Sequence, residues 1–154
     1  MSDDKRISVI LPNIRSLHNV GSIFRTADAV RAEKIYLTGY TGAPPDPRIE
    51  KVSLGADMYI PWVKRTYTTP IITRLKKKGY QIVALEQTKK SIDYRSYKPR
   101  FPVAVILGEE VGGVNERWLK QADVHVHLPM MGWKNSLNVS VAWGIVAYYL
   151  RTHL

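Results

Sequence analysis

Short apolar runs rich in β-branched residues recur along the chain and alternate with stretches of helical periodicity. The runs typical of buried strands are Ile7 to Leu11, Lys34 to Thr38, Met58 to Val63, Tyr80 to Leu85, Pro102 to Leu107 and Val124 to Leu128. The first two flank an expected helix from about Asn19 to Arg31. A strand, a helix and a strand within about thirty residues make a βαβ unit, which requires a parallel sheet. The pattern therefore predicts an α/β fold.

The first expected helix has one apolar face and two polar residues of interest. Asn19 can cap its start, and Gly21 in the first turn costs helix stability, which indicates close approach of a neighbouring group. Arg25 lies off the apolar face, where its guanidinium could reach over the carboxyl edge of the sheet. A solvated helix arginine is the plainer interpretation of Arg25.

The last fifth of the chain, LPMMGWKNSLNVSVAWGIV, combines a polar loop with a long apolar segment. Ser136 is well placed as the N-cap of a helix from Leu137 to Leu150, with Asn138 in its first turn. This helix is apolar on nearly every face, whereas a surface helix shows a polar stripe. We expect it to be buried on two sides, in a core and a subunit interface. An ordinary terminal core helix explains the apolar part equally well but not the polar loop.

Three other segments are candidates for contacts. Gly39 to Arg48 is a turn-rich loop and a candidate lid or partner contact. Thr88 to Arg100 is irregular and mixes basic residues with tyrosines, which can hold phosphates and stack on bases, although a solvated loop is as plausible. Gly108 to Gly113 would lie at the carboxyl edge of the sheet, where α/β folds bind ligands. Its residues Glu109 and Glu110 disfavour a pyrophosphate and favour a cationic or neutral ligand head.

Composition narrows the class of protein. At 154 residues and 45% hydrophobic, the chain suits one compact domain. No run approaches the roughly 20 apolar residues of a membrane span, and no signal peptide is evident, so we expect a cytoplasmic protein. The chain has no cysteine, which excludes disulfides, thiolate metal sites and cysteine nucleophiles. A net charge of +10 favours a polyanion, with nucleic acid before membrane.

Histidine offers little chemistry by comparison. His125 and His127 alternate on one expected strand and could ligate a metal, but a third ligand is not evident, so we expect no metal site. His18 precedes the first helix, where it could contact RNA or simply lie in a loop near the helix start.

Three stretches, in this order, together resemble the motifs of the SpoU/TrmH family of RNA ribose 2'-O-methyltransferases. They are NVGSIFR with Asn19 and Arg25, GEEVGG with Gly108 and Glu110, and LPMMGWKNSLNVSV from Leu128 to Val141. The resemblance implies a Rossmann-like parallel-sheet SPOUT fold whose C-terminal part forms a deep trefoil knot, and a homodimer. It covers the chain from about Ile7, so we expect one domain over residues 1–154 without a separate RNA-binding extension.

The same resemblance implies methyl transfer from S-adenosylmethionine to a ribose hydroxyl. It assigns catalytic roles to Arg25, Asn19, Glu110, Ser136 and Asn138. It assigns cofactor contacts to Leu85, Glu86, Gly108, Leu128, Met130, Ser136 and Leu137. A guanidinium remains protonated at ordinary pH, so we expect Arg25 to stabilise a developing alkoxide rather than act as a base, either within one subunit or across the dimer.

The expected substrate is tRNA or rRNA, and its phosphates need cationic partners. The candidates are Arg15, His18, Arg48, Lys89, Lys90 and Arg95. An alternative is a non-catalytic, dimeric RNA-binding protein of the same fold. A nucleotide-dependent oxidoreductase is a distant third, because the glycine fingerprint for a dinucleotide is missing.

Overall fold

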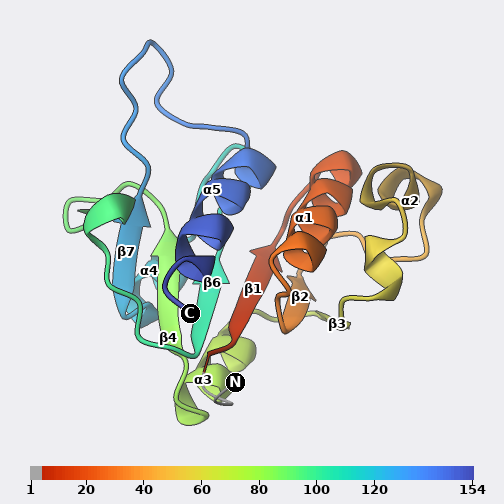
Figure 1. Ribbon diagram of the computed structural model, residues 1–154, viewed down its shortest axis with the longest axis horizontal. Helices are drawn as coiled ribbons and strands as arrows, with labels where there is room; N and C mark the ends of the chain where they lie inside the picture. Colours follow the sequence, from red (N-terminus) through yellow and green to blue (C-terminus); the bar gives the residue numbers. More distant parts are fainter. Residues whose placement is uncertain (1–4) are drawn as a thin grey trace.

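A seven-stranded, entirely parallel sheet forms the centre of the protein, whose computed structural model describes residues 5–154. The strands are β1 (Ile7–Pro12), β2 (Lys34–Thr38), β3 (Trp62–Arg65), β4 (Gln81–Leu85), β5 (Ile92–Asp93), β6 (Val103–Ile106) and β7 (Val124–His127). They lie in the order β3-β2-β1-β6-β4-β7-β5, and every neighbouring pair is parallel. All carboxyl ends therefore share one edge, the upper edge in Figure 1. The predicted α/β class is confirmed.

Helices cover both faces of this sheet. The helices are α1 (Leu17–Ala29), α2 (Pro47–Ser53), α3 (Thr69–Lys77), α4 (Glu116–Gln121) and α5 (Val139–Arg151). Figure 1 shows α1 and α5 side by side on one face, with α2 beyond α1, and α3 and α4 on the other face. Successive strand residues point to opposite faces of the sheet and enter different hydrophobic clusters. Val9 packs in the cluster under α1 and α5, and Ile10 packs in the cluster under α3 and α4. This double burial explains why the strands are continuous apolar runs.

The first helix begins two residues earlier than expected, and its cap is not Asn19. Ser16 is extended, and its Oγ accepts a hydrogen bond from the Asn19 N–H at 3.1 Å. Asn19 is consequently inside the first turn and buried. The expectation that Asn19 is the cap was wrong because serine at position 16 serves the same purpose. Asn19 is thereby free for another role.

The last helix begins two residues later than expected. Asn138 caps α5, with its Oδ1 accepting from the Ser140 N–H at 2.9 Å and the Ser140 hydroxyl at 2.7 Å. Ser136, expected as the cap, lies in the preceding loop. Figure 1 shows the loop between β7 and α5 standing above the rest of the molecule, and Trp133 in this loop is fully exposed.

Two further segments differ from the expectations. β3 begins at Trp62 rather than Met58, because Ala56–Met58 forms a 3-10 turn. The segment expected to be irregular, residues 88–100, contributes the short edge strand β5 and a 3-10 turn. Its two tyrosines are used inside the fold: Tyr97 is 2% exposed, and Tyr94 packs edge-on against Tyr149 with ring centroids 5.4 Å apart. The Tyr97 ring is closed to a base, and the half-buried Tyr94 ring already has an aromatic partner.

Only one side of α5 is buried in the single chain. Trp143, Val146, Ala147 and Leu150 lie in the core, whereas Val141, Ile145 and Tyr148 are exposed. The expected core face is confirmed, and the expected subunit interface stays a prediction. Within residues 5–154, no helix is long and apolar enough to cross a membrane.

Candidate active site

A cavity of about 1000 Å³ opens at the carboxyl edge of β4, β6 and β7. Its walls are the loops that follow these three strands and the first turn of α5, so distant segments converge there as expected for a parallel sheet. All seven residues predicted to contact a cofactor line the cavity: Leu85, Glu86, Gly108, Leu128, Met130, Ser136 and Leu137.

The turn after β6 owes its shape to two glycines and one carboxylate. Glu109 and Gly113 close the turn with reciprocal backbone hydrogen bonds of 3.1 Å. A Cβ at Gly108 would approach the Gly113 carbonyl carbon to 2.7 Å, and one at Gly113, where φ is +68°, would meet Glu86 Oε2 at 2.1 Å. Both positions therefore require glycine.

Glu86, directly after β4, holds this turn through hydrogen bonds of its carboxylate. Its Oε2 accepts from the Val114 N–H at 2.8 Å, and its Oε1 accepts from the Gln87 N–H at 3.0 Å. The side chain therefore holds the cavity wall, a positioning role that the sequence pattern did not reveal.

Glu110 joins this turn to the start of α1. Its carboxylate accepts hydrogen bonds from the backbone N–H groups of Arg15 and Ser16, both at 3.1 Å, and from the Asn19 side-chain amide at 3.2 Å. Desolvation raises the pKa of Glu110, but these donors together outweigh it and lower the pKa below its usual value. The side chain is thus a carboxylate bound at a helix N-terminus rather than a free turn residue.

Asn19 extends the same network to α5. Its Oδ1 accepts a hydrogen bond from Asn138 Nδ2 at 3.1 Å, so Glu110, Asn19 and Asn138 form one hydrogen-bonded chain. Glu110 and Asn138 both line the cavity. The three motifs that the sequence analysis singled out therefore meet in space, and four of the five residues predicted to be catalytic lie in or beside this cavity: Asn19, Glu110, Ser136 and Asn138.

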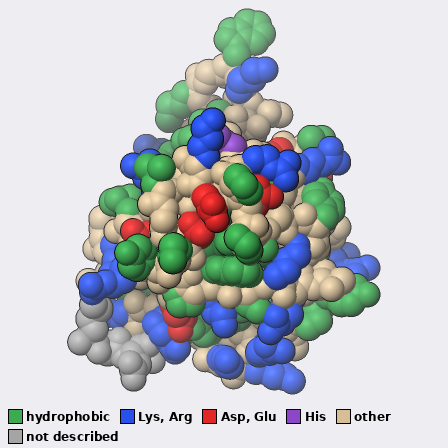
Figure 2. Space-filling view, turned by 90° about the vertical axis from the view of Figure 1, so that its right-hand side faces the viewer, with side chains coloured by type: hydrophobic (Ala, Val, Ile, Leu, Met, Phe, Trp, Pro, Cys, Tyr) green, Lys and Arg blue, Asp and Glu red, His purple; other side chains and the backbone are tan. Residues whose placement is uncertain are grey.

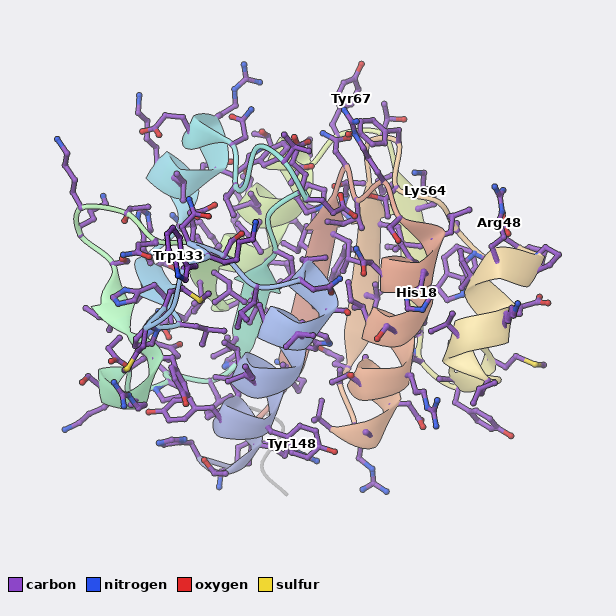
Figure 3. All side chains as sticks on the ribbon, turned by 90° about the horizontal axis from the view of Figure 1, so that it is seen from above. His18, Arg48, Lys64, Tyr67, Trp133 and Tyr148 are labelled. Atoms are coloured by element: carbon purple, nitrogen blue, oxygen red, sulfur yellow. The ribbon has the colours of Figure 1, made fainter. Side chains whose placement is uncertain are left out.

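Arg25 lies elsewhere in the single chain. It lines a second cavity of about 830 Å³ between α1 and α2, together with Arg15, His18 and Arg48. Lys51 adds another cation, and Leu17 and Val52 supply apolar surface. Figure 3, which looks onto the carboxyl edge, shows His18 on α1 and Arg48 on α2 at this side of the molecule. The arrangement makes a strongly cationic hollow suited to an anion.

The other predicted RNA contacts are scattered. Lys89 and Lys90 are exposed in the loop after β4, and neither lines either cavity. Arg95 is exposed but forms a bidentate pair with Asp93, with contacts of 3.0 and 2.6 Å that lower the pKa of Asp93. Arg48 is paired in the same way with Asp46, with contacts of 3.1 and 3.0 Å. Only Arg15, His18 and Arg48 of the six candidates are brought together.

The two strand histidines are occupied by hydrogen bonds. His125 is buried, with Nδ1 2.8 Å from the Thr88 hydroxyl and Nε2 2.8 Å from the Leu119 carbonyl oxygen. His127 Nδ1 lies 2.9 Å from the Ser91 hydroxyl. Over residues 5–154, no three His, Cys, Asp or Glu side chains are grouped as metal ligands.

The fold and the cavity define a parallel α/β protein with a ligand cradle built from three loops at one edge of its sheet. The chain belongs to the SpoU rRNA Methylase family, whose model matches residues 6–148. A protein of Staphylococcus saprophyticus, provisionally assigned to the TrmH family of tRNA/rRNA methyltransferases, is 34% identical over 148 residues, or 96% of this chain.

Solved structures share the same fold. The AdoMet-bound rRNA methyltransferase from Sinorhizobium meliloti superposes with a TM-score of 0.90 at 30% identity, covering 99% of this chain and 58% of that one. An RNA 2'-O ribose methyltransferase superposes with a TM-score of 0.88 at 25% identity, covering 99% and 58%. The chain spans 59% of the length of the Staphylococcus relative. The predicted family and the parallel-sheet SPOUT architecture are confirmed.

Proposed function

We propose that the protein transfers a methyl group from S-adenosylmethionine to a ribose 2'-hydroxyl of tRNA or rRNA. The observation that carries the proposal is the hydrogen-bonded chain of Glu110, Asn19 and Asn138 at the rim of the larger cavity. Support comes from the relatives, which include an AdoMet-bound rRNA methyltransferase and an RNA 2'-O ribose methyltransferase.

The cavity fits this cofactor in size and chemistry. Its volume of about 1000 Å³ is at the upper end of the range of small-molecule sites. Leu107, Leu128 and Met130 provide apolar walls, and Glu109, Glu110 and Glu116 give the lining a negative charge that suits a cationic ligand. When bound, S-adenosylmethionine supplies an electrophilic methyl group on a positively charged sulfur.

The residues of the chain must then activate a weak nucleophile. The 2'-hydroxyl must pass its proton to a phosphate or water before or as its oxygen attacks the methyl carbon, so that this oxygen carries partial alkoxide charge. The bond from that carbon to sulfur would break in the same step, and the cofactor would leave as a neutral thioether. Arg25 stabilises that charge as a permanent cation. Asn19 and Glu110 position the ribose and the start of α1, and Ser136 and Asn138 complete the site from the start of α5.

The separation of Arg25 from the cradle supports a site shared by two copies of the chain. Arg25 lines the smaller cavity and the predicted cofactor contacts line the larger one. A homodimer formed through the exposed side of α5, with Val141, Ile145 and Tyr148, would cover apolar surface and bring Arg25 of one copy toward the cradle of the other.

We also propose that the loops after β6 and β7 cross in a deep trefoil knot. Both loops line the same cavity, although 20 residues, including α4, separate Leu107 from Leu128 in the chain. A knot would fix the loops relative to each other without requiring a large core between them.

Calorimetric titration with S-adenosylmethionine and a methyl-transfer assay test the function. We expect saturable binding, followed by transfer of labelled methyl to total RNA and recovery of 2'-O-methylated nucleosides after digestion. Methylated bases would contradict the ribose target. RNA binding without cofactor binding would establish the non-catalytic alternative.

A further inference from the structure

Two exposed tyrosines stand at the carboxyl ends of adjacent strands, outside both cavities. Tyr40 is 56% exposed after β2, and Tyr67 is 72% exposed after β3. The register pairs Thr38 with Arg65, and a hydrogen bond of 3.2 Å from the Gly39 N–H to the Thr66 carbonyl extends the ladder by one position. Tyr40 and Tyr67 each follow the end of this ladder, so both lie at the carboxyl edge of the sheet on adjacent strands.

The backbone that carries Tyr40 is tightly held. Asn13 Oδ1 accepts from the Tyr40 N–H at 3.1 Å, and a Cβ at Gly39, where φ is +63°, would lie only 1.8 Å from that oxygen. On the other side, the Thr41 hydroxyl donates to the Leu11 carbonyl at 2.7 Å and accepts from the Ile14 N–H at 2.9 Å. The loop therefore presents Tyr40 from a fixed position.

Lys64 holds the same loop from β3. Its ammonium donates to the carbonyl oxygens of Gly39, at 2.6 Å, and of Thr41. Burial lowers the pKa of Lys64. Its role is thus to position the residues on either side of Tyr40.

The backbone that carries Tyr67 is held in the same way. Thr66 accepts the hydrogen bond from Gly39, and the Thr68 hydroxyl lies 2.7 Å from the Thr38 hydroxyl in a buried contact. The Thr68 carbonyl also accepts from the first turn of α3. Tyr67 lies between two anchored residues, and Figure 3 shows it directed outward at the edge of the molecule, beyond Lys64.

Charged side chains surround the two rings. The Arg15 Nε donates to the Tyr40 hydroxyl at 3.3 Å, and that hydroxyl is 3.5 Å from Glu109 Oε2, on the turn that borders the larger cavity. Arg65, two residues before Tyr67, is exposed. Figure 2, which faces β3 and α2, shows lysine and arginine side chains spread across this side. Tyr40 therefore lies between cationic surface and the turn that borders the cradle, and Tyr67 lies further out on the same side.

We propose that Tyr40 and Tyr67 form a stacking edge for unpaired bases of the RNA that flank the methylated nucleotide. This inference rests on the proposed RNA methylation. It identifies two residues that would make the protein bind single-stranded or looped RNA in preference to a continuous duplex. Tyrosines on a fixed backbone lose little conformational entropy on contact, and every base offers a π face. Arg15 and Arg65 are placed to meet the phosphates between the stacked bases. The tyrosines of residues 88–100, by contrast, are packed inside the fold.

Fluorescence anisotropy with labelled single-stranded oligo(A) RNA of about 12 nucleotides tests the stacking edge. We expect Tyr40→Ala and Tyr67→Ala each to weaken binding about tenfold, and Tyr67→Phe to retain wild-type affinity because its ring can still stack. An oligonucleotide of equal length with abasic sites should bind more weakly to wild-type protein and be insensitive to the substitutions. Tyr59→Ala is the matched control, because Tyr59 is 79% exposed but precedes β3 and so lies toward the opposite edge of the sheet.

Steady-state kinetics of methyl transfer can distinguish failure of the stacking edge from failure of the proposed function. If the edge binds substrate, Tyr67→Ala should raise the KM for RNA while leaving kcat and S-adenosylmethionine affinity near wild type. Wild-type KM in Tyr40→Ala and Tyr67→Ala, with active enzyme, would overturn the stacking edge alone. Equal binding of intact and abasic RNA would also overturn it. Failure of the wild-type protein to bind the cofactor or to methylate any RNA would instead overturn the proposed function.

Discussion

Asn138 Nδ2 donates a hydrogen bond to Asn19 Oδ1 at 3.1 Å, joining residues 119 positions apart in sequence. Because Asn19 in turn donates to Glu110 at 3.2 Å, the starts of α1 and α5 and the turn after β6 share one polar network. Networks of this kind fix geometry when every member is satisfied, and they lose it when one member is removed.

Replacing Asn138 should therefore affect activity beyond its effect on the helix. Asn138→Ala removes both the α5 cap, which contributes about 0.5–2 kcal/mol, and the bond to Asn19. We expect a folded, dimeric protein with at least about tenfold weaker methyl transfer, checked by light scattering and a tritium-transfer assay. Asn115→Ala is the matched control, because Asn115 caps α4 with an equal 2.9 Å bond but has no part in the network. Equal activity losses in both variants would show that Asn138 acts only as a helix cap. A monomeric Asn138→Ala protein would show that Asn138 contributes to the subunit interface.

Arg25 provides a direct test of the catalytic proposal. Arg25→Ala should lower the methyl-transfer rate by at least about a hundredfold, because a developing oxyanion would lose its cation. S-adenosylmethionine affinity, measured by calorimetry, should stay near wild type because Arg25 does not line the larger cavity. Arg74→Ala on α3 serves as the control for loss of an exposed helix arginine. Wild-type turnover in Arg25→Ala would remove Arg25 from the mechanism.

The bound carboxylate of Glu110 predicts a stability change in acid. Its pKa in the folded protein is below the ordinary value of 4.5, so its contribution to the free energy of unfolding is complete above about pH 4.5 and is lost as the pH falls through the folded-state pKa. Urea denaturation should show wild type more stable than Glu110→Gln by a constant amount at neutral pH, and this difference should shrink as the pH falls below the ordinary pKa of 4.5. Glu50→Gln on α2 is the control. A difference independent of pH would mean that ionisation of Glu110 is not what stabilises the fold.

Arg31 predicts a stabilising substitution at the end of α1. It adopts φ +54° directly after the helix C-cap Val30, a conformation that costs a side-chain-bearing residue about 1 kcal/mol. Arg31→Gly should raise the free energy of unfolding by about 0.5–1 kcal/mol, measured by urea denaturation. Arg31→Ala keeps the Cβ and should not reproduce the gain. Equal stability of the two variants would show that the backbone conformation is not the cause.

RNA affinity should depend strongly on salt. If about six phosphates are neutralised, a plot of log affinity against log salt concentration should have a slope of about −4 to −5. Arg48→Ala, in the cationic hollow beside α2, should make this slope less negative by about one. A slope near zero would exclude phosphate contacts as the main source of affinity.

Local pattern predicted most of the elements but not all of their ends. The runs at Lys34 to Thr38 and Tyr80 to Leu85 became β2 and β4 almost unchanged, because both faces of a central parallel strand are buried and leave an apolar signature. Asn19 was mistaken for the cap of α1 because Ser16 and Asn19 are both competent cap residues and lie only one turn apart. Near Met58, the apolar pattern did not separate a 3-10 turn from the start of β3.

Residue types and their local spacing were enough to predict the α/β class and the order of strands and helices along the chain. They also revealed the excess of cationic residues and the three polar motifs. The bonds from Asn19 to Asn138 and Glu110, the support of a turn by Glu86 and the separate cavity at Arg25 appeared in the folded chain alone. The fold also showed that the tyrosines exposed at the carboxyl edge are Tyr40 and Tyr67, and not those of residues 88–100 that the sequence pattern had suggested for base stacking. The physical reason is that periodicity reports which side of an element is buried. Hydrogen-bond partners and exposed rings depend on which strands become neighbours and on how the loops close over their ends.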